Sequence, residues 1–243
     1  MDKRLKSIAE NYDNLVIGLD DTFRFHCKIC GNCCIHREDI ILNPKDIYNI
    51  AKALDKEPHE IVAEYCETYL GHSSKMVLVR LIPRGGVKRC PFLSNLKCSI
   101  HKYKPTVCAL YPLGRSMKAP KNGSKNILNA KVEYIFQKPT CGDASETHSV
   151  RDWLSEFNLL EDEEYFKTWM QLVADLGKTI RRVEDECSPD VVEALATSVL
   201  VSIYLDYNTS EPFLPQFLKN EKDYRKTLSE LLHQFGIPNE LNG

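Results

Sequence analysis

The sequence has little glycine and none of the glycine-rich loops that bind phosphate. Only 11 of its 243 residues are glycine, and it contains neither a P-loop nor a G-x-G-x-x-G motif following a strand. The G-x-S-x-G and H-E-x-x-H motifs are also missing. These absences argue against a nucleotide-binding enzyme, a Rossmann-type methyltransferase domain and the common hydrolase sites. No carboxylate pair suited to acid–base catalysis can be identified, so the sequence leaves enzyme activity open.

Long apolar runs are missing too. None reaches the roughly 18–20 residues that are needed to span a bilayer. The opening stretch, MDKRLKSIAENYDNL, lacks the apolar core of a signal peptide. We therefore expect a cytoplasmic protein without membrane association. Because that compartment is reducing, its 10 cysteines are better explained as metal ligands than as disulfides.

Acidic residues are absent between Glu67 and Glu133, where 13 Lys or Arg occur. Residues 1–142 carry 23 Lys and Arg against 14 Asp and Glu, a balance of +9, and residues 143–243 carry 9 against 20, a balance of −11. The basic stretch 68–132 could bind an anionic ligand or partner. Alternatively, its charge offsets cysteine thiolates and the acidic half, which is the interpretation we favour. We expect a protein partner and do not expect nucleic acid.

Eight of the cysteines lie in turn-like segments marked by glycine or proline. They are Cys27, Cys30, Cys33, Cys34, Cys90, Cys98, Cys108 and Cys141. The other two, Cys66 and Cys187, lie in helix-like surroundings, and we expect them to be small buried hydrophobic residues. Eight thiolates make two sets of four, the number taken by a tetrahedral zinc or by a four-iron cluster.

The octet CKICGNCC, residues 27–34, favours iron–sulfur chemistry. Its first three cysteines form C-x2-C-x2-C, the run that bacterial ferredoxins wrap around a four-iron cluster. Gly31 provides the permissive backbone that such a loop needs. We predict one or two 4Fe-4S clusters, with zinc as the alternative because C-x2-C is also a zinc knuckle.

The sequence assigns the remaining cysteines to the two metal sites only in part. In ferredoxins a Cys-Pro dipeptide closes a site, which gives Cys90 that role. Cys34 adjoins Cys33, so its side chain should project differently and serve a second site with some of Cys98, Cys108 and Cys141. His101, three residues after Cys98, is the histidine that could best replace a thiolate, although a surface position is the more common role.

Three blocks of the sequence carry a family resemblance: FRFHCKICGNCC, IILNPKDIYNIAKALDKEPHEIVAEY and CPFLSNLKCSIHKYKPTVCALYPLG. Together, over about residues 23–142, they resemble the YkgJ-family cysteine-cluster proteins, which are described as zinc- or iron-chelating. The resemblance implies that the first seven of the eight cysteines are ligands and supports Cys141 less directly. This chain has His101, Lys104 and Ala109 where the family usually has tyrosine, arginine and arginine. Flagellin lysine N-methylases are similar to this family, which adds methyl transfer from S-adenosylmethionine as an alternative.

The pattern of apolar residues predicts an α+β fold in three parts. Residues 1–22 form a helical lead-in, 23–142 a small mixed α/β metal-stapled domain, and 143–243 a helical bundle packed on it. Asn43-Pro44 should start a helix, a second should run near 58–70, and strands are expected near 38–42, 75–83 and 127–138. Apolar residues at spacings of three and four predict the helices of the last part, which should bury Trp153 and Trp169.

Three functions agree with these observations. The first is a cytoplasmic iron–sulfur protein with a redox, accessory or cluster-handling role. The second is a methylase that uses a cluster, and the third is a structural zinc protein. We favour the first, because the cysteine spacing is that of a ferredoxin loop.

Overall fold

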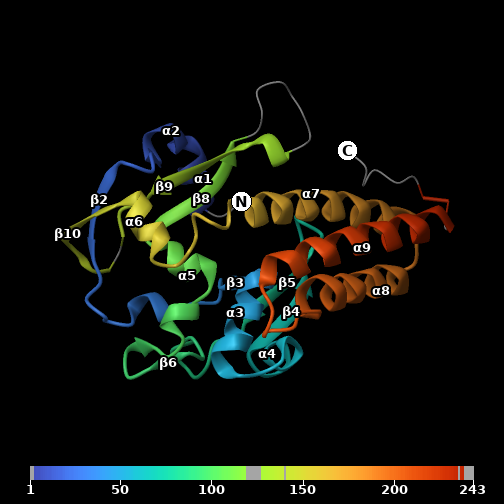
Figure 1. Cartoon of the computed structure of the whole chain (residues 1–243), viewed down its shortest axis with the longest axis horizontal. Helices are drawn as coiled ribbons and strands as arrows, with labels where there is room; N and C mark the ends of the chain where they lie inside the picture. Colours follow the sequence, from blue (N-terminus) through green and yellow to red (C-terminus); the bar gives the residue numbers. More distant parts are fainter. Residues whose placement is uncertain (1–2, 119–126, 140, 235, 238–243) are drawn as a thin grey trace.

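A computed structural model describes residues 3–118, 127–139, 141–234 and 236–237. The fold is α+β, as the sequence predicts, with a strand-rich region and a helical region in contact (Figure 1). None of the helices in the described ranges is both long enough and apolar enough to cross a membrane.

Three long helices, α7–α9, form the helical region on the right of Figure 1. They span Glu163–Glu186 (α7), Pro189–Val199 (α8) and Phe213–Gln234 (α9), and a π-helical turn, η4, continues α8 over Leu200–Leu205. As predicted, the apolar stretch of α8 and η4 is central: Val199, Ile203 and Tyr204 are almost completely buried.

A three-stranded antiparallel sheet lies beneath these helices in the order β3-β5-β4. Its strands are Ile41–Leu42 (β3), Val77–Leu81 (β5) and Cys66–Leu70 (β4). Helices α3 (Pro44–Leu54) and α4 (Pro58–Tyr65) connect β3 to β4. Asn43 caps α3 as predicted: its side chain accepts from the backbone of Asp46, and Pro44 occupies the first turn.

The rest of the strand-rich region is built from short elements. Strands β1 (Val16–Ile17), β9 (Lys131–Phe136) and β8 (Leu113–Lys118) form a second sheet. Strand β2 (Thr22–His26) pairs with β10 (Asp143–Ser149), and β6 (Leu93–Ser94) with β7 (Lys97–Cys98). The helices of this region are α1 (Lys3–Glu10), α2 (Tyr12–Leu15), α5 (Thr106–Leu110) and α6 (Val150–Ser155). Residues 143–149, which follow the expected domain boundary, therefore lie on the strand-rich side.

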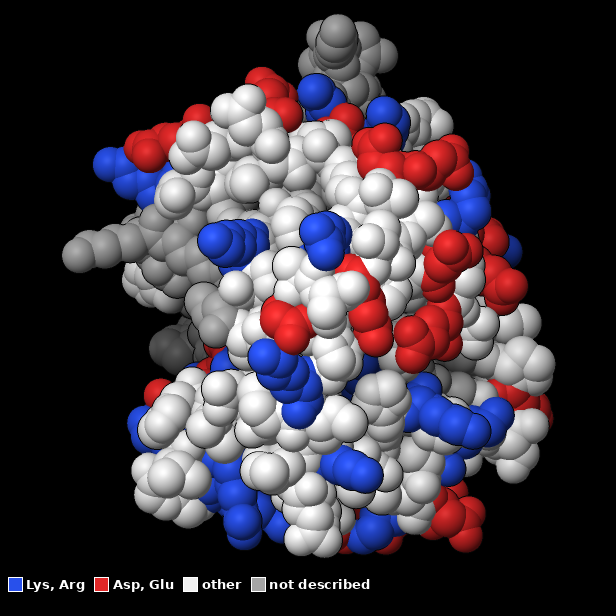
Figure 2. All heavy atoms as spheres, turned by 90° about the vertical axis from the view of Figure 1, so that its left-hand side faces the viewer, with Lys and Arg blue, Asp and Glu red and all other residues white. Residues whose placement is uncertain are grey.

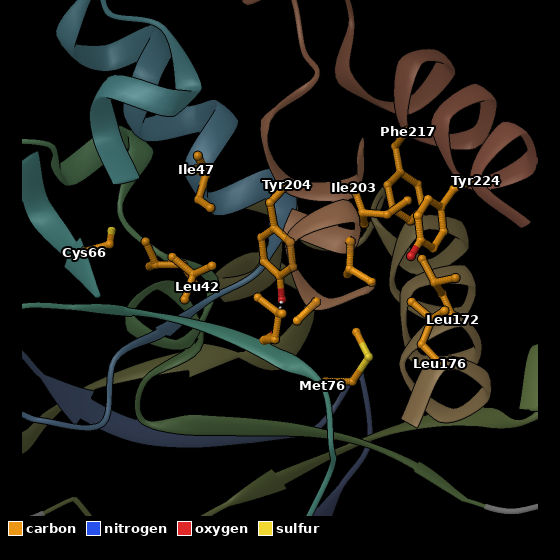
Figure 3. Packing of buried hydrophobic residues seen from close by; sticks show 14 of the residues in the cluster. Leu42, Ile47, Cys66, Met76, Leu172, Leu176, Ile203, Tyr204, Phe217 and Tyr224 are labelled. Carbon is orange, nitrogen blue, oxygen red and sulfur yellow. Dashed lines mark hydrogen bonds between the residues drawn. The ribbon is translucent and has the colours of Figure 1, made fainter. Parts of the chain in front are cut away.

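Two hydrophobic clusters hold these elements together. The larger joins the β3-β5-β4 sheet and α3 to the long helices, with Tyr204 in its middle (Figure 3). The hydroxyl of Tyr204 donates to the carbonyl of Val77 on β5 at 3.1 Å. The smaller cluster packs Phe23 and Phe25 of β2 against α5, β8 and α6. Burial of apolar surface stabilises a folded protein by about 25 cal/mol per Å². The larger cluster therefore holds the helical region and the β3-β5-β4 sheet together.

Three expectations about local structure are wrong or only partly met. Residues 66–70 form edge strand β4 rather than the end of a helix, because pairing with β5 outweighs the helix-like local pattern. The stretch 114–126, GRSMKAPKNGSKN, has the composition of a loop, but its first residues belong to strand β8, and residues 119–126 lie outside the described residues. Trp153 and Trp169 are half-buried rather than buried.

Candidate metal centre

The cysteine octet follows β2 directly and turns sharply. Ile29 and Gly31 both have left-handed backbone conformations, with φ of 51° and 71°. Residues Asn32–Cys34 then form one turn of 3-10 helix, in which the Cys34 amide donates to the Gly31 carbonyl at 2.8 Å. Gly31 thus provides the backbone freedom that the sequence indicates.

The sulfurs of Cys33 and Cys34 lie 3.7 Å apart, so the expected divergence of these two side chains is wrong. The tight turn brings them together. A hydrogen bond from the Cys34 thiol lowers the pKa of Cys33 to about 6. The same bond, followed by burial, raises the pKa of Cys34. The short contact therefore shifts the two pKa values in opposite directions.

Cys34 lies beside the later cysteines of the chain. The Cys90 amide donates to the Cys34 carbonyl at 2.7 Å, and the sulfurs of Cys90 and Cys108 raise the pKa of Cys34 further. Cys98 lies on β7, where it pairs with Leu93 of β6. This β6–β7 hairpin starts three residues after Cys90. The side chains of these three later cysteines all pack against the larger hydrophobic cluster. We term these three and Cys34 the inner set: Cys34, Cys90, Cys98 and Cys108. Cys33 borders this set, because burial, and to a smaller extent the Cys33 sulfur, raises the pKa of both Cys90 and Cys98.

Cys141 returns to the first three cysteines because β10 pairs with β2. Asp143 is opposite His26, the residue before Cys27. Gly142 fits closely there: it has a φ of 76°, and a Cβ on it would lie 2.5 Å from the His26 carbonyl oxygen. Burial raises the pKa of Cys141, and the sulfurs of Cys33, Cys30 and Cys27 raise it further. We term this second neighbourhood the outer set: Cys27, Cys30, Cys33 and Cys141.

Burial governs the three later thiols of the inner set. It is the largest cause raising the pKa of Cys90 and Cys98, and it raises that of Cys108 to about 12. A buried neutral thiol is inert, and it becomes a ligand only when a metal displaces its proton. Metal binding at this set should therefore release protons.

Two half-buried cations accompany the sulfurs. Arg37 donates to the Cys33 carbonyl at 3.2 Å and also bonds Asp39. Lys104 lies 4.1 Å from the ring centre of Phe157, and burial lowers its pKa while Cys108 acts in the opposite direction. Positive charge beside thiolates offsets part of their mutual repulsion. The acid-free stretch thus supplies at least one cation to the cysteines.

A buried network fixes the helix that carries Cys108. Asp46 is only 2% exposed, and its Oδ1 accepts from the backbone amide and the hydroxyl of Thr106, both at 2.7 Å. Its Oδ2 accepts from the Asn43 amide at 3.1 Å. The Tyr165 hydroxyl donates to Asn43 Oδ1 at 2.9 Å, which ties the network to α7. Asp46 therefore connects the start of α3 to the start of α5.

The other candidate side chains lie at the margin of the cysteines. The Tyr111 hydroxyl is 3.3 Å from the Cys141 sulfur. His101 is exposed and packs against Phe157, as expected for a surface histidine. Cys66 is buried in the larger cluster, where burial raises its pKa to about 12, and Cys187, directly after α7, packs against that cluster.

The distances between the ligand atoms show whether a site for a single metal ion is already formed. Among the described residues, no three His, Cys, Asp or Glu side chains are close enough together to hold one metal ion. A tetrahedral zinc with bonds of about 2.3 Å requires sulfurs about 3.8 Å apart. Cys33 and Cys34 meet that spacing as a pair, but no set of four does within the described part of the chain. The donors are all thiols and all ten cysteines are free, so a metal held here would have sulfur ligands.

Sequence reasoning missed the residues around the sulfurs. The LNPKD stretch indicates a capped helix, but the bond from Asp46 to Thr106 depends on tertiary contact. Lys104 is one of many lysines in a basic stretch, and no local signal marks it as the one beside the thiols.

Comparison with known proteins identifies one similarity. Residues 26–142, which include all eight cysteines of the two sets, match the family model CxxCxxCC, described as "Putative zinc- or iron-chelating domain". No curated protein and no solved structure matches the chain. The match supports a cysteine-cluster, metal-binding role for this part of the chain.

Proposed function

We propose that the chain is an iron–sulfur protein whose two sets of four cysteines each hold one 4Fe-4S cluster. The outer set is Cys27, Cys30, Cys33 and Cys141, and the inner set is Cys34, Cys90, Cys98 and Cys108. The observation that carries this proposal is the pairing of β10 with β2, which returns Cys141 to the ferredoxin-like run. This differs from the pairing that the Cys90-Pro91 dipeptide suggests, because the Cys90 amide bonds to Cys34.

The number and kind of the donors support a cluster in each set, because each set offers four free thiols. A cubane is larger than an ion and accepts one thiolate at each of its four irons. Such clusters supply one-electron transfer, and the chain's own residues would tune it. Arg37 and Lys104 place positive charge near the sulfurs, and the hydrophobic cluster under the inner set lowers solvent access. The role we propose is electron transfer or cluster handling, in the cytoplasm, for a larger enzyme system.

Metal analysis of anaerobically purified protein tests the proposal. About eight irons and eight sulfides per chain, with broad visible absorbance that dithionite bleaches, are expected from two cubanes. A colourless protein that holds zinc would refute it. The close Cys33–Cys34 pair makes zinc the second candidate, because its 3.7 Å separation suits a tetrahedral ion.

Pairs of substitutions test the assignment of ligands to sets. Cys30→Ala and Cys141→Ala should each remove about four irons, and the double variant should lose no more than either alone. Cys30→Ala combined with Cys98→Ala should lose about eight. If Cys141→Ala and Cys98→Ala prove to act on the same cluster, the assignment is wrong even if both clusters exist.

The resemblance to YkgJ-family proteins and flagellin lysine N-methylases supplies an alternative use of the same centres. In that reading a cluster assists methyl transfer from S-adenosylmethionine to a protein lysine. Calorimetric titration of the iron-loaded protein with S-adenosylmethionine separates the two roles. Saturable binding would favour methyl transfer, and its absence would favour the redox or cluster-handling role.

A further inference from the structure

Three loops surround the cysteines and present large apolar side chains to solvent. Ile29 in the octet is 52% exposed, Val87 in the turn before Cys90 is 54% exposed, and Leu96 in the β6–β7 turn is 60% exposed. These residues, with Arg84, Arg89 and Lys97 on or beside the same loops and Lys102 on the 3-10 turn that follows β7, are called the three-loop face below. Single exposed apolar residues are common, but three around one candidate metal centre require an explanation.

Contacts to the octet hold the three loops together. The His36 amide donates to the Val87 carbonyl at 3.1 Å, and the Cys90 amide to the Cys34 carbonyl. A Cβ placed on Gly31 would lie 3.4 Å from Cδ2 of Leu96, so the β6–β7 turn lies against the octet on its other side. The three apolar tips are therefore grouped around the same sulfurs.

Two of the tips are held in strained backbone. Ile29 and Leu96 have φ of 51° and 62°, a region that costs a bulky side chain of order 1 kcal/mol and that glycine occupies freely. Strain at ligand sites persists where the surrounding structure over-determines it. Here the surrounding turns hold two large apolar side chains outward.

The segments that form the three-loop face contribute positive charge only, although Glu38 and Asp143 from neighbouring segments pair with Lys88 and Lys28. Segments 27–37 and 82–102 contain seven Lys or Arg and no Asp or Glu. Figure 2 shows Lys and Arg among uncharged atoms over the lower part of the left-hand face, with Asp and Glu towards its margins, on the side where β6 lies in Figure 1. Arg37 and Lys104 are half-buried and face the sulfurs, so they account for charge compensation.

The outer cations are different from those two. Arg84, Arg89, Lys97 and Lys102 are exposed, and none of them forms an ion pair with an acidic residue in the part of the chain that the structure describes. Lys88, on the same turn, is paired with Glu38. Arg84 lies over the Tyr65 ring, 5.4 Å from its centre, and the four cations come from the segments that carry or follow the apolar tips. A polar rim beside an apolar centre is the composition of a protein interface.

We infer that the three-loop face docks an acidic protein surface with an apolar centre, the partner that exchanges electrons or clusters with the cysteines. This inference rests on the proposed function, since it names the partner of that centre. Opposite charges steer such encounters, and redox complexes use small interfaces of this kind. The aliphatic tips argue against single-stranded nucleic acid, whose bases stack on aromatic side chains.

Fluorescence anisotropy with two synthetic probes tests the inference on the full, metal-loaded chain. The first probe is a labelled 18-residue helical peptide with glutamate on one face and leucine on the other. The second is a single-stranded oligonucleotide of equal charge. We expect micromolar binding of the peptide that weakens as salt rises, and weaker binding of the oligonucleotide.

Two variants separate the apolar from the charged contribution. Ile29→Ser/Val87→Ser/Leu96→Ser should weaken peptide binding at least tenfold and leave oligonucleotide binding unchanged. Arg89→Gln/Lys97→Gln should weaken both probes and reduce the salt dependence. The matched controls lie on the helical region: Val201→Ser, at 54% exposure, and Lys219→Gln/Lys226→Gln should change neither probe.

Several results would overturn the inference. Absence of peptide binding would do so, as would a control variant with the same effect as the loop variants. Tighter binding of the oligonucleotide, insensitive to the serine changes, would replace the acidic protein with nucleic acid. Iron and sulfide are measured in each sample. If the protein contains clusters but does not bind the peptide, the docking inference alone is refuted. A protein without iron refutes the proposed function instead.

Discussion

Asp46 links the fold to the candidate centre, and its replacement by asparagine gives a sharp prediction. One carboxylate oxygen accepts from the Thr106 amide and the other from the Asn43 amide. Asparagine offers a single oxygen, so whichever way its amide turns, one backbone donor loses its acceptor. Leaving a buried donor unsatisfied costs about 1–3 kcal/mol. Asp46→Asn should therefore destabilise the fold by about 2 kcal/mol.

The expected readout is thermal unfolding of the metal-loaded protein followed by circular dichroism. For a chain of this length, about 2 kcal/mol corresponds to a Tm lower by roughly 4–8 °C. Because Thr106 starts the helix that carries Cys108, iron should also be lost faster to a chelator. Asp152→Asn is the matched control, since Asp152 accepts from the Ser149 cap in the same way but is exposed. An unchanged Tm, or one equal to that of the control, would refute the role of the network.

The effect of Asp46 should also depend on pH. Burial raises the pKa of Asp46 above its ordinary value of 3.8, although its hydrogen bonds oppose the shift. A carboxyl with a raised folded pKa favours the folded state in its protonated form, and this contribution is lost as the pH rises through the folded pKa. Asparagine has no such titration. The stability gap between wild type and Asp46→Asn should therefore be larger at pH 5 than at pH 8, and a gap that shrinks on acidification would contradict this reasoning.

Cysteine variants give the remaining predictions. Cys30→Ser should lose metal and melt at a lower temperature, because ligation and folding are coupled; full metal content with an unchanged melting curve would remove it from the ligands. Cys66→Ala and Cys187→Ala should retain all metal, and loss of one equivalent in either variant would show that it is a ligand. At pH 8, iodoacetamide should leave Cys66 unmodified in the folded protein. Burial raises the pKa of Cys66 to about 12, and only the thiolate reacts. If mass spectrometry finds Cys66 alkylated before the protein unfolds, its burial is contradicted.

Elements with a strong local signal were predictable from the sequence. Asn43-Pro44 identifies the start of α3, and the apolar stripes identify the long helices. Strand β4 was mistaken for helix because its structure depends on pairing with β5. Strand β10 has a polar sequence, DASETHS, and no apolar alternation; only its distant partner β2 makes it a strand. Local patterns cannot reveal such pairings.

The candidate metal centre, like the fold, was predictable from the sequence only in part. The cysteine count and the C-x2-C-x2-C run were visible in the sequence, and all eight cysteines lie within the matched segment. Their grouping was not, because it depends on the β10–β2 register and on the bond from Cys90 to Cys34. Asp46 and Lys104 could not be singled out either, since burial against other elements gives them their surroundings.

The pairing of β10 with β2 also sets an order of events during synthesis. Cys108 completes the inner set, whereas Cys141 comes 108 residues after Cys33 in the outer set. At translation rates of about 5–20 residues per second, the first three outer cysteines wait roughly 5–20 s for their fourth partner. For those seconds they are an open, solvent-accessible thiol loop on a nascent chain. If each set holds a centre as proposed, the outer one closes later and is the one more exposed to oxidation while the ribosome is still at work.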